Sequence, residues 1–201
     1  MVRSPIIFYF YYPLDTNGLI GFLPTDLSLL TNLILISLDK NALRGTIPTQ
    51  FGRLTNLSKL FLQENEFSGD LPSELGSLKE LQTIDLKTNS LNGKIPEEFF
   101  SMIRLEQLAL GSNSLTGTLS TSAGQLKALK HLDLQISLLS GTIPSELGEL
   151  TLLTTLSLGY NLFSGQVPRE LGLLQNLSLL DISKLNELSR VERVLCFQRV
   201  F

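Results

Sequence analysis

The single histidine of the chain, His131, lies two residues before the carboxylate Asp133. In an extended strand, residues two apart point to the same face, so the two side chains have the spacing of a general acid–base pair. Covalent catalysis would also need a nucleophile beside them, and the only cysteine, Cys196, lies near the carboxyl end of the chain. No motif supplies another nucleophile, and we therefore expect the protein not to be an enzyme.

The carboxylates Asp85 and Asp133 are the second candidate for chemistry. If they lie two strands apart in one sheet, about 10 Å separates them at the usual strand spacing. A calcium ion bound by both would need oxygens at about 2.3–2.6 Å, so a shared metal is not expected. The sequence also lacks the Cys/His spacing of a zinc site, the glycine-rich phosphate loop and the kinase motifs. We expect no metal ion and no cofactor.

The elements that must position these residues belong to a repeat of 24 residues. Asparagine occupies six of seven positions spaced by this period, and the remaining position is occupied by Ser137. A glycine follows four residues after every one of these positions, and a proline follows seven residues after six of them. Self-similarity at one fixed spacing indicates a stacked repeat architecture. The six asparagines are Asn17, Asn41, Asn65, Asn89, Asn113 and Asn161.

Apolar residues recur in fixed columns of the repeat. Two of them, spaced two apart, precede most of these positions, as Leu60 and Leu62 precede Asn65. This alternation predicts a strand with one buried face. Further apolar columns follow, and one of them runs from Ile47 to Val167. A single turn of the repeat cannot enclose these side chains, so neighbouring turns must stack to bury them.

The polar columns predict how the turns are held together. We expect the asparagines to form a structural ladder, in which each amide pairs with backbone groups of neighbouring coils. Ser137 lacks the amide, and we expect a weakened rung there that stays in register. The glycine column suits a tight turn or a close approach to the next coil. The proline column suits the start of a short helical or extended turn.

The unit LxxLxLxxNxLxGxIPxxLGxL resembles the plant-type leucine-rich repeat, whose xGxIP portion distinguishes it from other leucine-rich repeats. It occurs as LSKLFLQENEFSGDLPSELGSL from Leu57 to Leu78 and as LTTLSLGYNLFSGQVPRELGLL from Leu153 to Leu174. The resemblance implies an α/β-type solenoid, a right-handed coil with a parallel β-sheet on the concave face and short 3-10 or helical turns on the convex face. It also implies extracellular recognition, as in receptor-like kinases, receptor-like proteins and polygalacturonase-inhibiting proteins.

Length and composition fit a single array. We expect one leucine-rich repeat domain over residues 1–201, with about seven regular repeats over 9–184 and a degenerate tail over 185–201. A formal net charge of -3 without clustered Lys and Arg argues against nucleic-acid binding. No apolar run approaches the length of a membrane span. A lone cysteine cannot form an internal disulfide.

Both ends of the chain admit alternatives. Residues 1–13 are either the strand of a first coil, with Tyr12 and Leu14 in the strand columns, or a weak secretory signal, and we favour the strand. Residues 185–201 are either a short amphipathic helix that covers the open end or sequence read past an exon boundary. Complete members of the resembling family usually carry paired cysteines in terminal caps, which this chain lacks. A Tyr- and Phe-rich edge strand without a cap would also invite aggregation, so we expect a fragment or a truncated gene model whose amino-terminal cap lies upstream.

Residues that alternate with the buried leucines face outward on the predicted concave sheet. This face is mixed, polar and modestly acidic, and we expect a protein or peptide ligand, or a carbohydrate, to bind along it. Two sequons, at Asn56 and Asn176, are candidate glycosylation sites in a secreted protein. The expected ligand-binding residues are Lys59, Phe61, Gln63, Asp85, Lys87, His131, Asp133 and Tyr160.

The sequence thus predicts a non-catalytic recognition module, the sensor portion of an extracellular or cell-surface protein. One alternative is a secreted inhibitor or carbohydrate-surface binder similar to the polygalacturonase-inhibiting proteins. Another is an intracellular scaffold, which would suit the missing cysteine caps. A third is the severed sensor of a receptor kinase whose enzyme lies outside these residues.

Overall fold

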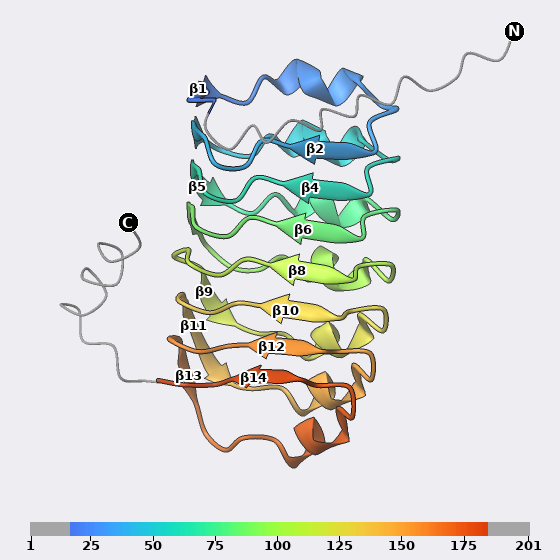
Figure 1. The fold of residues 1–201 in the computed structure, drawn as a ribbon, viewed down its shortest axis with the longest axis vertical. Helices are drawn as coiled ribbons and strands as arrows, with labels where there is room; N and C mark the ends of the chain where they lie inside the picture. The colour runs from blue at the N-terminus through green and yellow to red at the C-terminus, as the bar shows by residue number, and fades with distance from the viewer. Residues whose placement is uncertain (1–16, 185–201) are drawn as a thin grey trace, which may run out of the picture.

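The computed structural model describes residues 17–184, which form a stack of similar coils (Figure 1). Each complete coil runs from a strand of the main sheet through a corner and a second extended segment to a 3-10 helix. The predictions made for residues 1–13, Leu14 and 185–201 lie outside this range.

In the described part of the chain, the main sheet contains seven parallel strands in the order of the coils. Neighbouring strands pair with equivalent residues opposite one another, so Leu60 faces Ile84, and Leu108 faces Leu132. Figure 1 shows these strands side by side down one face of the stack. The predicted strand columns are confirmed. The strands are β2 (Leu35–Ser37), β4 (Lys59–Phe61), β6 (Thr83–Asp85), β8 (Gln107–Ala109), β10 (His131–Asp133), β12 (Thr155–Ser157) and β14 (Leu179–Asp181).

Two smaller parallel sheets follow the corner, and the sequence analysis did not predict them. At the glycine column it expected a tight turn or a close approach to the next coil, and Gly69 lies inside a strand with φ +80°. A Cβ atom at Gly69 would lie 2.9 Å from Thr46 Cγ2 of the preceding coil, so glycine permits both the backbone angle and the close approach. The strands are β1 (Ile20–Phe22), β3 (Ala42–Gly45), β5 (Glu66–Asp70) and β7 (Ser90–Asn92) in one sheet, and β9 (Thr116–Thr118), β11 (Leu138–Thr142) and β13 (Leu162–Ser164) in the other.

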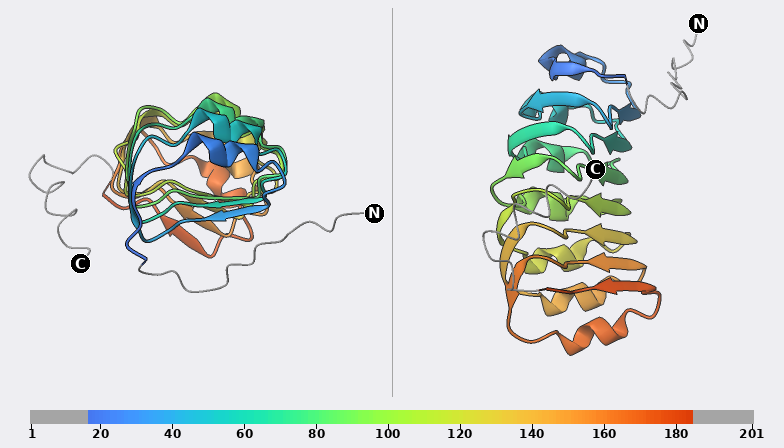
Figure 2. Two further views of the ribbon diagram at one scale, coloured as in Figure 1. Left: turned by 90° about the horizontal axis from the view of Figure 1, so that it is seen from above. Right: turned by 60° about the vertical axis from the view of Figure 1, so that its left-hand side comes forward.

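The return segments are 3-10 helices on the side opposite the main sheet (Figure 2). Proline precedes six of the seven helices found in residues 17–184. Pro72, for example, has φ -65°, and its carbonyl accepts a hydrogen bond from Leu75 N at 3.1 Å. This confirms the predicted role of the proline column. The helices are η1 (Thr25–Leu29), η2 (Thr49–Arg53), η3 (Ser73–Ser77), η4 (Glu97–Ser101), η5 (Thr121–Gln125), η6 (Ser145–Glu149) and η7 (Arg169–Leu173).

One continuous apolar core fills the space between these layers, from Leu23 to Leu174. Leu60, Ile84 and Phe67 have no exposed surface. Burying an aliphatic side chain contributes roughly 1.5–3 kcal/mol, so stacking supplies the main stabilising term. Val167 was predicted to point inward but is 51% exposed. It lies in the last described coil, so no further described coil covers it.

The asparagine side chains tie neighbouring coils together. Asn113 Oδ1 accepts a hydrogen bond from Leu91 N at 3.0 Å, and its Nδ2 donates to Leu86 O at 3.0 Å and Leu110 O at 2.8 Å. Each amide therefore pairs with backbone groups of its own coil and of the preceding one. The same pattern recurs at Asn65, Asn89 and Asn161. Asn41 makes the bonds to its own coil and to Leu19 N, and Asn17 is exposed at the first described position.

Ser137 interrupts this series. Its side chain is 5% exposed, and its hydroxyl has no hydrogen-bond partner among the described residues. The coils stay in register across this position, since β9 and β11 still pair from Leu138 opposite Thr116 to Ser140 opposite Thr118.

We expect Ser137→Asn to raise the free energy of unfolding by about 1–2 kcal/mol, because the amide would provide the missing acceptor and donors for buried backbone groups. Urea denaturation of the full chain measures this change. Ser90→Asn is the matched control, since Ser90 is exposed and lies one residue after its own asparagine. Equal midpoints for Ser137→Asn and Ser90→Asn would contradict the assignment of a missing rung.

Candidate functional site

The solvent side of the main sheet, here called the sheet face, presents most of the predicted binding residues. They come from the outward positions of the short strands and from the residues directly after them, because the inward positions are filled by the core. Lys59 and His131 are exposed, whereas Asp85 is only 7% exposed and is therefore more covered than a solvated face would imply. Phe61, Gln63, Asp133 and Tyr160 are half-buried.

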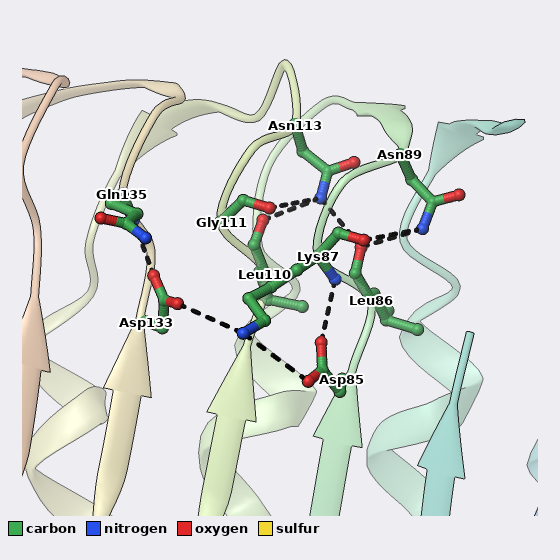
Figure 3. A network of polar contacts seen from close by, with 9 residues as sticks. All are labelled: Asp85, Leu86, Lys87, Asn89, Leu110, Gly111, Asn113, Asp133 and Gln135. Carbon is green, nitrogen blue, oxygen red and sulfur yellow. Dashed lines mark hydrogen bonds and ion pairs between the residues drawn. The ribbon is translucent and has the colours of Figure 1, made fainter. Parts of the chain in front are cut away.

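An ion cluster spans three coils of this face. Lys87 Nζ lies 3.9 Å from Asp85 Oδ2 and 3.8 Å from Asp133 Oδ2. Figure 3 shows the lysine reaching past the end of strand β8 to the second carboxylate. The intervening coil offers only Ala109 and Gly111 here, and a Cβ atom at Gly111 would lie 2.8 Å from Asp133 Oδ1. Small residues on the middle coil therefore allow one cation to pair with carboxylates two coils apart.

Burial raises the pKa of both carboxyls above the ordinary range of aspartate. The Lys87 ammonium opposes this rise at both sites, as do hydrogen bonds from Lys87 N to Asp85 Oδ1 at 3.2 Å and from Gln135 N to Asp133 Oδ1 at 3.3 Å. Lys87 and these backbone N–H groups therefore favour the ionised form of both carboxyls.

Lys87→Met is expected to destabilise the protein at neutral pH by about 1 kcal/mol and to have little effect at low pH. A native pKa above the unfolded value means that stability falls as pH rises through the interval between them. Loss of Lys87 raises both pKa values further, so the cost appears as the carboxyls ionise and vanishes below about pH 4. Urea midpoints measured across pH test this, with the exposed Lys59→Met as control. A cost that does not vary with pH would contradict the coupling.

His131 and Asp133, which have the spacing of an acid–base pair, contact different partners. His131 Nδ1 lies 3.4 Å from Thr154 Oγ1, and Asp133 is bonded to Gln135 N and Lys87. No hydrogen bond or ion pair joins His131 to Asp133 within residues 17–184. In the same range, no group of three or more His, Cys, Asp or Glu residues could hold a metal ion.

Tyr160 lies at the edge of the sheet face, beyond the end of β12. It follows β12 in a left-handed conformation with φ +56°, and the Lys184 ammonium lies 5.2 Å from its ring centroid. The residue before each asparagine position has this conformation, from Lys40 to Lys184. This column forms the rim where the main sheet turns toward the smaller sheets, so Tyr160 is a rim residue.

A groove at the starts of β2, β4 and β6 was not predicted. It has a volume of about 450 Å³, and its lining includes the sequon residue Asn56, whose Nδ2 donates to Thr31 O at 2.9 Å. The sequence feature that could have predicted this groove is the pair of mostly polar repeat columns directly before the strands of the main sheet. The groove is lined by Asn32, Ile34, Asn56, Ser58, Glu80 and Gln82.

Comparison with known proteins agrees with this geometry. The Leucine Rich Repeat family model matches residues 56–78 and 80–102. One chain of the BIR3–SERK2 complex from Arabidopsis thaliana is 32% identical, with 67% of this chain and 71% of that chain covered and a TM-score of 0.60. This chain belongs to the plant-type leucine-rich repeat family.

Larger members of the leucine-rich repeat family are also similar. The ectodomain of the Arabidopsis thaliana membrane receptor kinase GASSHO1/SCHENGEN3, in complex with CASPARIAN STRIP INTEGRITY FACTOR 2, is 37% identical over 85% of this chain, with a TM-score of 0.83. The ectodomain of the Arabidopsis receptor kinase HAESA, in complex with an IDA peptide hormone ligand, is 36% identical over 85% of this chain, with a TM-score of 0.81. The present chain spans 21% and 29% of their lengths.

No curated protein sequence gives a significant match to this leucine-rich repeat chain. Within residues 17–184, none of the helices has the length and apolar character that crossing a membrane requires.

Proposed function

We propose that this leucine-rich repeat chain is a non-catalytic sensor module that binds a peptide ligand along its sheet face, as part of an extracellular or cell-surface protein. The observation that carries the proposal is the similarity to two receptor-kinase ectodomains, one in complex with a peptide hormone and one with CASPARIAN STRIP INTEGRITY FACTOR 2.

The sheet face has physical properties that suit such a ligand. Successive coils place side chains at about 4.8 Å intervals, so an extended peptide that crosses the strands meets a new set of side chains at each coil. The face offers an aromatic ring at Phe61, cations at Lys59 and Lys87, and carboxylates at Asp85 and Asp133. Backbone hydrogen bonds between coils fix the strands that carry these side chains before binding, which lowers the entropic cost of association.

The two sequons support an extracellular location. Asn56 and Asn176 are exposed at the same position of their coils, and each Nδ2 donates to a backbone carbonyl of the preceding coil, at 2.9 and 2.7 Å. A glycosylated asparagine keeps one hydrogen on this nitrogen, so the bond and the modification are compatible. We propose both as glycan sites, and mass spectrometry of the protein secreted from plant cells would detect the two modified peptides.

Selection from a displayed library of random linear peptides tests the binding proposal. The full chain should enrich a family of related peptides, and Phe61→Ala or Asp133→Ala should weaken their binding without loss of fold. Glu74→Ala is the matched control, since Glu74 is exposed on η3 on the opposite side of the stack. Enriched peptides that bind both face variants as tightly as the wild type would move the site off the sheet face.

A further inference from the structure

Two neighbouring coils carry apolar residues where the other coils are mostly polar. Before the asparagine position, Ile136 and Tyr160 replace the Lys40, Glu64, Thr88 and Ser112 of the earlier coils. After it, Leu138 and Leu162 replace the Ala42, Glu66, Ser90 and Ser114 of those coils. We call Ile136, Leu138, Tyr160 and Leu162 the rim patch.

The rim patch lies on adjacent coils at the edge of the sheet face. Ser137 N donates a hydrogen bond to Tyr160 O at 3.2 Å, and Ser140 of β11 pairs with Leu162 of β13. All four side chains of the patch are half-buried, so each keeps part of its surface in contact with solvent. The departures thus gather at one place on the molecule.

Stability alone does not account for these residues. Ile136 has φ +52°, a left-handed conformation that a β-branched residue adopts only at a cost of about 1–3 kcal/mol. The next residue, Ser137, is the one position of the series that lacks the amide. Thr88, which is also β-branched, has φ +54° in the same column, so the left-handed backbone belongs to the repeat, and the apolar side chains and the missing amide are what distinguish the rim patch.

The charges beside the rim patch indicate the chemistry of its partner. The pair of carboxylates that Lys87 bridges, Asp85 and Asp133, has a counterpart two coils further on. There, Asp133 and Asp181 lie on either side of a coil that carries Ser157 and Gly159. A Cβ atom at Gly159 would lie 2.8 Å from both carboxylate oxygens of Asp181, as one at Gly111 would lie 2.8 Å from Asp133 Oδ1.

In this second arrangement the residue equivalent to Lys87 is the uncharged Gln135. Within residues 17–184, no cation lies at ion-pair distance from Asp181, and the nearby Lys184 ammonium lies over the Tyr160 ring. Asp181 Oδ1 accepts a hydrogen bond from Ser183 N at 2.9 Å, as Asp133 Oδ1 does from Gln135 N at 3.3 Å. A ligand cation can therefore take the place that Lys87 takes in the first arrangement.

We infer that the rim patch and the Asp133–Asp181 pair form one subsite, an inference that rests on the proposed function. The subsite would bind a peptide segment in which an aliphatic or aromatic side chain lies close to a lysine or arginine. The apolar side chain covers Ile136, Leu138 and Leu162. The basic side chain lies over Gly159 between the two carboxylates. Apolar burial supplies affinity, and the cation supplies selectivity.

The test uses the same displayed peptide library on the full chain and on two variants. Ile136→Thr/Leu138→Ser gives the patch the residues that Thr88 and Ser90 supply two coils earlier, so the repeat already accommodates them. Asp181→Asn removes one carboxylate charge. The matched control is Thr88→Ser/Ser90→Ala in the equivalent columns, and circular dichroism checks the fold of each variant.

We expect the wild type to enrich peptides with an apolar and a basic residue close together. The rim variant should weaken their binding at least about tenfold, and Asp181→Asn should lose the preference for the basic residue. Enriched peptides that lack this pair, or that bind both variants as tightly as the control, would overturn the subsite and leave the proposed function standing. No enrichment with the wild type would overturn both.

Discussion

Leu108→Asp is expected to lower the free energy of unfolding by at least about 4 kcal/mol, because it removes a buried aliphatic side chain and places an unpaired charge in the core. Leu108 is 1% exposed and pairs across the sheet with Ile84 and Leu132. In a solenoid each coil is stabilised by its neighbours, so damage in a central coil weakens the stack on both sides. Urea denaturation followed by circular dichroism measures the change.

Gln107→Asp is the matched control for this experiment. Gln107 is the adjacent residue of β8 and is half-buried on the sheet face, between Thr83 and His131 of the neighbouring strands. Its replacement adds the same charge where water can solvate it, and we expect a change below about 1 kcal/mol. Similar midpoints for the two variants would contradict the assignment of the buried and exposed faces of the strand.

Asn113→Ala is expected to cost about 2–4 kcal/mol, because the side chain is 2% exposed and its loss leaves buried backbone groups without partners. The amide accepts from Leu91 N and donates to Leu86 O, Leu110 O and Gly111 O, so one truncation removes four hydrogen bonds in two coils. The measurement is again the urea midpoint of the full chain.

Asn32→Ala provides the control for the asparagine experiment. Asn32 is an exposed asparagine at the groove beside β2, outside the series at the corners. We expect its replacement to change the free energy of unfolding by less than about 0.5 kcal/mol. If Asn113→Ala were as mild as Asn32→Ala, the corner amides would contribute little to holding the coils together.

The candidate site was only partly predictable from the sequence. Outward-facing strand residues such as Lys59 and His131 are placed by the period-two alternation, and the structure exposes both. The cluster of Asp85, Lys87 and Asp133 was not predicted, because its ion pairs depend on how far a lysine reaches across a coil of small residues.

The sequence by itself determined the period, the strands of the main sheet, the inward columns and the turns that begin after proline. These features are local, since a pattern within one unit of 24 residues specifies each of them, and repetition makes the pattern visible. Only the tertiary structure decided the smaller sheets, the rim position of Tyr160 and the exposure of Val167. Each of these depends on contacts between successive coils, such as the pairing of Gly69 with Leu91, or on whether a further coil follows.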